Sequence, residues 1–197
     1  MRLHLSFEGL IVKALCSILL LFACSFAYAE KDFAVSLGAG GATVQAGAND
    51  AFGKDVNFRL GEGFAGIRYK WIGIEQRIGR GLMGETIKVG EDPDSQRAIT
   101  QKTAIDSYAT SYLRLQFDND IARIYGLYGQ TVMSATSESS TTGFRDIESE
   151  GDSYGLGVGI RINKAIHFNV EARQFISNEL DSIWGISFNI DIAVISL

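Results

Sequence analysis

Three segments late in the chain alternate apolar residues with polar residues or glycine, and no other feature constrains the fold as strongly. They are Tyr154–Ile162, Ala165–Arg173 and Ile183–Val194. Successive side chains of a β-strand point to opposite faces, so a period of two predicts a strand that meets a different environment on each face. Only Asn163 and Lys164 separate the first two segments, which is the spacing of a tight hairpin.

The first residues have the pattern of a secretory signal peptide. Positive charge precedes a short apolar run at Ala14–Phe26, and a small-residue cleavage site follows at Ala27–Ala29. The run is too short for a permanent membrane anchor. We predict that residues 1–29 are a cleaved signal peptide and that residues 30–197 form the mature domain. The alternatives are an uncleaved anchor helix and lipoprotein processing at Cys24.

Composition excludes several classes of protein. Both cysteines, Cys16 and Cys24, lie in the predicted leader, so the mature domain has neither a disulfide framework nor a thiolate site. A net charge of −5 without a basic run argues against a nucleic-acid partner. Abundant glycine (22 residues), a single proline and the lack of a helical period after the leader favour many strands.

Five further strands are predicted before these three, and the connections between strands alternate in length. The predicted strands are Phe33–Val44, Val56–Tyr69, Ile72–Gly79, Ala104–Phe117 and Ile121–Ser134. The long connections are Gln45–Asp55, Arg80–Thr103 and Ala135–Asp152. This alternation predicts an all-β fold, an eight-stranded antiparallel up-and-down transmembrane β-barrel with short periplasmic turns and longer outer loops.

The second predicted strand changes phase along its length. Phe58 and Leu60 fall on the face opposite to Ile67. We attribute this change to a bulge near Gly61 or Gly63, because one extra residue reverses the side-chain alternation.

The polar face decides between a membrane barrel and a soluble, lipocalin-like barrel. A soluble barrel usually carries many Lys and Glu on its outer face. Here the polar faces hold Gly, Ser, Asn, Gln, Tyr and Arg with almost no Lys, which suits the narrow lumen of eight strands. We therefore predict that the apolar faces meet lipid and the polar faces line the lumen. Aromatic residues near the strand ends, such as Trp71 and Trp184, agree with two interfacial girdles.

Eight charged residues fall on the predicted lumen face. They are Arg68, Glu75, Arg77, Arg114, Arg123, Arg161, Glu171 and Arg173. A buried charge is costly unless it is paired, so we expect Glu75 and Glu171 to bridge arginines in the bidentate geometry that arginine favours. One interpretation is a packed plug that sets the register of the barrel. The other is a gated path for small anions, because arginines outnumber acids in this set.

The sequence predicts no catalytic, cofactor-binding or metal site. His167 is the only histidine after the leader and no Cys remains, so a His/Cys metal cluster cannot be built. Outer-membrane lipid A deacylases pair a His with a nearby Ser, whereas here Asn169 stands two residues after His167. The acidic cluster Glu91–Asp94 lacks the spacing of an EF-hand.

The same strands carry a resemblance to a known family. The resemblance rests on the segments Tyr154–Gly159, Phe168–Arg173 and Ile183–Phe188, with Gly66–Tyr69 and Ile72–Glu75 as a further hairpin. The pattern resembles the small outer-membrane β-barrel family that includes the OmpA transmembrane domain and OmpX. Two departures are the final Leu197, where many members end in Phe, and the lack of a downstream peptidoglycan-binding domain.

The resemblance implies a porin-like, OmpA-like protein in the outer membrane of a Gram-negative cell envelope. We expect a monomer with a structural or surface-interaction role, a plugged lumen and no enzymatic activity. Expected partners are outer-membrane lipid, the assembly machinery and periplasmic chaperones during biogenesis, and an extracellular partner bound by the loops. The alternatives are a small-solute or anion pore, a lipid A-modifying enzyme and a soluble periplasmic ligand-binding barrel.

Overall fold

The computed structural model describes residues 33–46, 56–91, 98–139, 143–177 and 182–196, and these are almost entirely β-strand. The strands are β1 (Phe33–Ala46), β2 (Val56–Tyr69), β3 (Ile72–Met83), β4 (Glu85–Glu91), β5 (Ala98–Asp118), β6 (Ala122–Ser139), β7 (Gly143–Arg161), β8 (Ile166–Ser177) and β9 (Ser182–Ser196). The predicted signal peptide lies outside the described residues. No helix among the described residues is long and apolar enough to cross a membrane.

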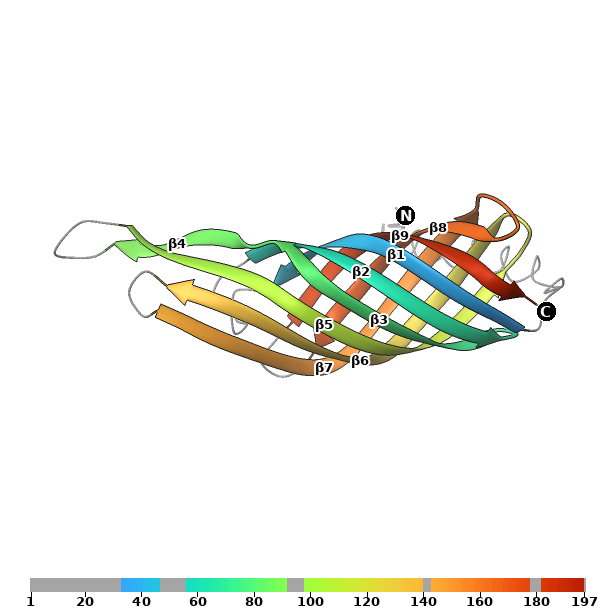
Figure 1. Cartoon of the computed structure of the whole chain (residues 1–197), viewed down its shortest axis with the longest axis horizontal. Coiled ribbons are helices and arrows are strands. Elements are labelled where there is room, and N and C mark those ends of the chain that lie inside the picture. Colours follow the sequence, from blue (N-terminus) through green and yellow to red (C-terminus); the bar gives the residue numbers. More distant parts are fainter. Residues whose placement is uncertain (1–32, 47–55, 92–97, 140–142, 178–181, 197) are drawn as a thin grey trace, which may run out of the picture.

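The strands form one closed antiparallel barrel (Figure 1). Apart from β3 and β4, strands that are neighbours in sequence pair with one another, β1 pairs with β9, and the pairing of β3 with β5 closes the sheet. Because β3 and β4 follow one another across Gly84 as parts of one barrel strand, the barrel has eight strands. The predicted fold class is therefore confirmed.

The strands are strongly tilted, as the register shows. The pairings followed once around the barrel from Phe33 return to β1 at Thr43, ten residues further along the strand. A stagger of this kind is what closure with tilted strands requires, and eight strands leave an interior that side chains can fill.

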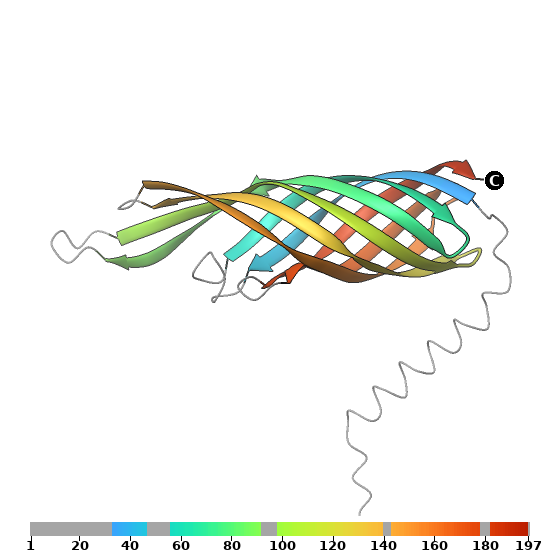
Figure 2. The ribbon, with the colours of Figure 1, turned by 90° about the horizontal axis from the view of Figure 1, so that it is seen from below.

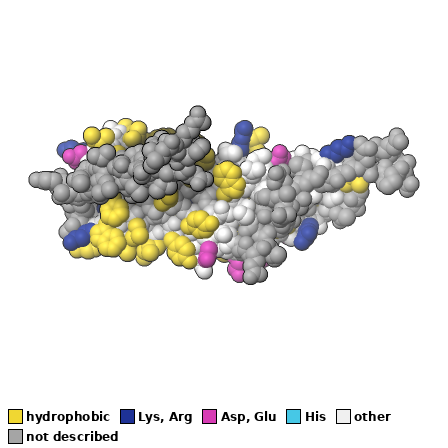
Figure 3. Space-filling model, turned by 180° about the vertical axis from the view of Figure 1, so that it is seen from behind, with side chains coloured by type: hydrophobic (Ala, Val, Ile, Leu, Met, Phe, Trp, Pro, Cys, Tyr) yellow, Lys and Arg dark blue, Asp and Glu magenta, His cyan; other side chains and the backbone are white. Residues whose placement is uncertain are grey.

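The apolar faces point outward and the arginine-bearing faces point inward. Leu156 is 70% exposed and Phe188 53% exposed, whereas Glu171 and Arg173 are buried. Hydrophobic side chains gather over the barrel end of the molecule, and charged ones lie at the edge of that end and towards the other end (Figure 3). Exposed Tyr69, Trp71 and Phe117 lie near the short turns, and Tyr154 and Trp184 lie towards the opposite end of the apolar belt.

Two predicted loops are wrong, because most of their residues are strand. In Arg80–Thr103 the strands β3, β4 and β5 leave only residues 92–97 outside the described structure. In Ala135–Asp152, β6 runs to Ser139 and β7 begins at Gly143. Beyond the buried Thr103, Ser137 and Ile147, the described side chains of these extensions are exposed or half-exposed on both faces, so the apolar–polar contrast that reveals a strand is missing there. The third loop, Gln45–Asp55, lies almost wholly outside the described residues.

The extensions form a sheet that projects beyond the barrel. β4, the first part of β5, the end of β6 and the start of β7 pair in that order, and they extend past the ends of the other strands (Figure 2). Residues 85–91, 98–106, 135–139 and 143–151 make up this projecting sheet. Its strands are direct continuations of barrel strands.

The predicted bulge in the second strand is also wrong. The register between β1 and β2 is unbroken, and the shift between β2 and β3 lies at Arg59 and Leu60. Phe58, Leu60, Glu62 and Phe64 share one inward face and are all buried. The lumen therefore changes from charged to apolar along its axis, and the strand keeps its phase.

Candidate functional site: the charged lumen

Arg77 on β3 lies at the centre of the lumen charges. Its Nη1 and Nη2 donate to Glu171 Oε2 and Oε1 at 2.7 and 2.8 Å, which is the bidentate geometry that arginine favours. Its Nε donates to Glu75 and its Nη1 also donates to Glu62 at 3.1 Å. The Arg77 side chain is 0% exposed, so three carboxylates from three strands surround one fully enclosed guanidinium.

Glu62 and Arg173 form a second pair beside this centre. Arg173 Nη2 donates to both Glu62 oxygens at 2.7 Å, and Tyr108 Oη donates to Glu62 Oε2 at 2.6 Å. Sequence reasoning missed Glu62 because its neighbours Phe58 and Leu60 are apolar. The sequence does contain a signal for it. Glu62 lies an even number of residues from Arg68 on the same strand, and an even spacing puts both side chains on the same face.

Arg114 and Tyr125 connect the centre to the half of the lumen nearer the short turns. Arg114 Nη1 donates to Glu75, and its guanidinium lies 3.8 Å from the centre of the Tyr125 ring. Tyr125 Oη donates to Glu171 Oε1 at 2.6 Å. A cation over an aromatic face is attracted by the ring quadrupole, so Tyr125 binds both partners at once.

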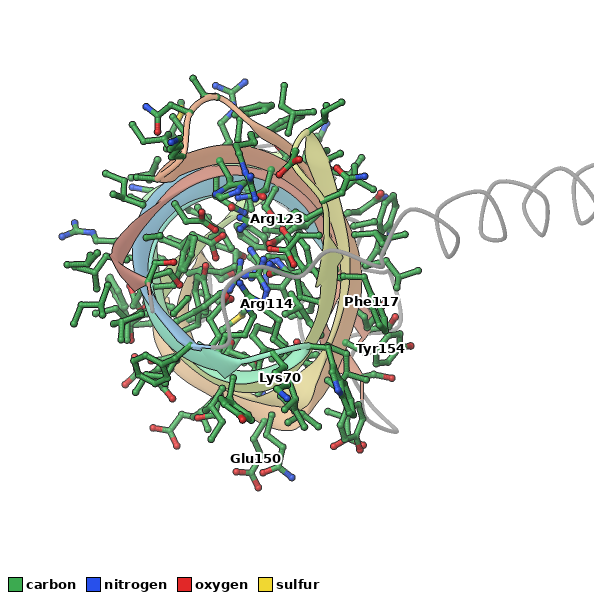
Figure 4. The ribbon with its side chains drawn as sticks, turned by 90° about the vertical axis from the view of Figure 1, so that its right-hand side faces the viewer. Lys70, Arg114, Phe117, Arg123, Glu150 and Tyr154 are labelled. Carbon is green, nitrogen blue, oxygen red and sulfur yellow. The ribbon has the colours of Figure 1, made fainter. Side chains whose placement is uncertain are left out.

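A third cluster lies closer to the short turns. Arg123 donates through Nε and Nη2 to Asn169 Oδ1 at 2.9 and 2.6 Å, and it pairs with Asp191. Asn169 Nδ2 donates to Asn189 Oδ1 at 2.8 Å. Seen along the barrel axis, Arg114 and Arg123 point into the interior, whereas Phe117 and Tyr154 point outward (Figure 4).

The two remaining predicted charges lie at the mouth of the barrel. Arg68 pairs with Asp118 at 3.4 Å and Arg161 with Asp120 at 3.5 Å, beside the short turns. The structure thus brings Glu75, Arg77, Arg114, Arg123, Glu171 and Arg173 together, and leaves Arg68 and Arg161 apart from them.

The lumen charges balance once the missed acids are included. Inside the barrel four arginines (Arg77, Arg114, Arg123 and Arg173) face four carboxylates (Glu62, Glu75, Glu171 and Asp191). Each mouth arginine has its own aspartate. The excess of arginines that suggested an anion path is therefore absent among the described lumen residues.

An apolar layer fills the lumen on the side of the projecting sheet. It contains Val44, Phe58, Leu60, Met133, Phe175, Ile176 and Ile183, all 2% exposed or less. Arg173 lies against this layer, with its guanidinium 4.3 Å from the centre of the Phe175 ring. Along the axis, pairs of charges are therefore followed by packed hydrocarbon, and a hollow of about 50 Å³ remains beside Arg68, Arg114 and Arg123.

The described surroundings of His167 are charged. The cross-strand neighbours of His167 are Arg161 and Asp191, with no serine facing it. Asp191 Oδ1 lies 3.4 Å from His167 Nδ1. No group of three or more potential metal-ligating side chains is found in the described part of the chain.

Solved structures with a similar fold are small outer-membrane barrels. Ail of Yersinia pestis in complex with the heparin analogue sucrose octasulfate has a TM-score of 0.58 at 13% identity, over 82% of this chain and 98% of Ail. The N-terminal barrel of Pseudomonas aeruginosa OprF has a TM-score of 0.56 at 9% identity, over 82% and 97%. Neisserial surface protein A has a TM-score of 0.55 at 11% identity, over 81% and 96%.

No curated protein matches the sequence. The family described as "Outer membrane protein beta-barrel domain" matches residues 14–192, which is most of the chain. The location predicted from the sequence is therefore confirmed, and the chain is an outer-membrane protein that belongs to this β-barrel family.

Proposed function

We propose that the protein is a closed outer-membrane barrel that presents a sheet for surface interactions, and that it neither conducts solutes nor catalyses a reaction. The projecting sheet carries this proposal, because it is a large regular structure that the barrel does not need for closure. The paired lumen charges and the apolar layer support the closed state. His167, which has no nucleophile opposite it among the described residues, supports the lack of catalysis.

A closed lumen predicts that the protein conducts no ions across a bilayer. The purified protein in a planar lipid bilayer should give no unitary current steps, because four buried ion pairs and a packed apolar layer leave no continuous water path. A wide-pore porin reconstituted in the same way provides the positive control. Reproducible steps from the folded protein, identified by its faster gel migration when unheated, would support the pore alternative instead.

The charge of the projecting sheet indicates the kind of partner. By sequence, its described strands and the adjoining Asp152 hold eight acidic residues (Glu85, Glu91, Asp106, Glu138, Asp146, Glu148, Glu150 and Asp152) against three basic ones (Lys88, Lys102 and Arg145). Opposite charges steer association, so a basic protein surface fits this sheet better than a polyanion does. The sulfated ligand of Ail therefore does not transfer to this chain.

Shortening the sheet tests the surface role. Glu85 pairs with Thr103 and Ala135 pairs with Ile147, so residues 86–102 and 136–146 can each be replaced by Asn-Gly to close two hairpins. We expect cells displaying the full-length protein to retain a small basic protein such as lysozyme at low salt, and the shortened variant to lose that retention. Equal retention by a shortened variant that still folds and fractionates with outer membranes would refute the surface role.

A further inference from the structure

A polar pair lies on the outward face of one barrel wall. Gln76 on β3 and Ser111 on β5 are cross-strand neighbours, and Ser111 Oγ donates to Gln76 Oε1 at 2.6 Å. Along β3, Gln76 stands between Ile74 and Ile78, which are 69% and 65% exposed. These two isoleucines belong to the apolar belt, so the Gln76 amide faces lipid.

The depth of Gln76 makes its amide costly. It lies five residues along the chain from Trp71, which stands in a short periplasmic turn. A strand that rises ~3.3 Å per residue at a tilt of about 40° gains roughly 2.5 Å of height per residue, which places Gln76 roughly 12 Å into an apolar band ~25 Å tall. Hydrocarbon offers no hydrogen-bond partner, and the structure shows no acceptor for the Gln76 amide nitrogen among the described residues.

The wall beside this pair carries small residues. Gly61, Gly63 and Ala65 form the outward face of β2 beside Gln76 and Ile78. Next to the pair, towards the projecting sheet, Gly61, Gly63 and Ile78 line a hollow of about 830 Å³. A second hollow, of about 620 Å³, lies on the far side of the barrel between the bulkier Tyr154, Leu156 and Trp184. Small residues let two backbones approach closely in a membrane.

We propose that a second copy of this chain packs against this wall, through the dimer patch formed by Gly61, Gly63, Ala65, Gln76, Ile78 and Ser111. A carboxamide has both donors and acceptors, so the same group on a two-fold-related copy can satisfy it. The hollow also has opposite charges on its rim, Arg80 and Asp106. A patch with both signs is self-complementary when a two-fold axis brings Arg80 of one copy to Asp106 of the other. The proposal replaces the monomer expected from the sequence.

Cysteine cross-linking tests the dimer patch in intact outer membranes. The only cysteines of the chain lie in the predicted leader, so a single introduced cysteine reports on one site. Ala65→Cys lies directly beside Gln76 in the register, and Leu156→Cys is a matched outward position on the far wall. We expect a disulfide-linked dimer from Ala65→Cys and several-fold less from Leu156→Cys.

The role of the Gln76 amide is tested in the Ala65→Cys variant. Adding Gln76→Leu to Ala65→Cys should reduce cross-linking several-fold while the folded, heat-modifiable band remains. Cross-linking that is equal at the two cysteine positions, or that survives Gln76→Leu, overturns the proposal. Native mass spectrometry of the wild-type protein from mild detergent provides a second readout. A dimer supports the proposal, and a monomer that retains lipid overturns it in favour of a lipid-filled hollow.

Discussion

Arg77→Ala should lower the free energy of unfolding by about 3–5 kcal/mol, the cost of breaking a buried ion pair by removing one partner. Arg77 contacts Glu62, Glu75 and Glu171, and its side chain is fully buried. Its removal leaves three enclosed carboxylates that share the remaining arginines. The measurement is urea unfolding in lipid vesicles, followed by the gel mobility of the folded band.

Two further variants make this prediction specific to the buried network. Arg161→Ala removes a mouth arginine whose partner, Asp120, is 96% exposed, and exposed pairs contribute less than about 1 kcal/mol. Arg77→Met combined with Glu171→Gln removes one charge of each sign and should recover part of the loss. If Arg77→Ala proved as stable as Arg161→Ala, the lumen carboxylates would not depend on Arg77.

Gly157→Ala should destabilise the barrel by about 3 kcal/mol, because the new methyl group has no room. A Cβ at Gly157 would lie 2.3 Å from Cζ of Tyr125, whose ring stacks on Arg114 and whose hydroxyl donates to Glu171. The ring must move, and both contacts are then lost. The same urea titration in vesicles measures the effect.

Gly126→Ala is the matched control for this substitution. Gly126 faces outward on the neighbouring strand, and a Cβ there meets only Leu156 Cδ2 at 3.9 Å. We expect little change in stability. Tyr125→Leu combined with Gly157→Ala should lose less than the sum of the two single variants. Full additivity would show that the strain at Gly157 does not act through the Tyr125 ring.

Side-chain alternation predicted the barrel because its two faces meet two different media. The inward positions of Arg77, Glu171 and Arg173 follow from strand parity alone. Parity could not show which carboxylate meets which arginine, because that depends on the stagger between strands distant in sequence. Arg77 and Glu171 form their bidentate pair across 94 residues of chain.

The apolar part of the lumen and the projecting strands could not be predicted from the sequence, for two different physical reasons. A polar lumen predicts only polar residues at inward positions, so the inward Phe58 and Leu60 resemble a bulge in the sequence, and Glu62 does not stand out beside them. The projecting strands were missed for the opposite reason. Beyond the buried Thr103, Ser137 and Ile147 both faces meet the same solvent, so only β-branched residues such as Ile99 and Thr100 mark these segments as strands in the sequence.

The continuity between the barrel and the projecting sheet has a mechanical consequence. β5, β6 and β7 run unbroken from the short turns into the projecting sheet. A pull on the tip of that sheet acts along these strands, at right angles to the hydrogen bonds between them. Many bonds then resist the load in shear at the same moment, instead of opening one after another. A cell held by this tip would be tethered through the full length of the strands.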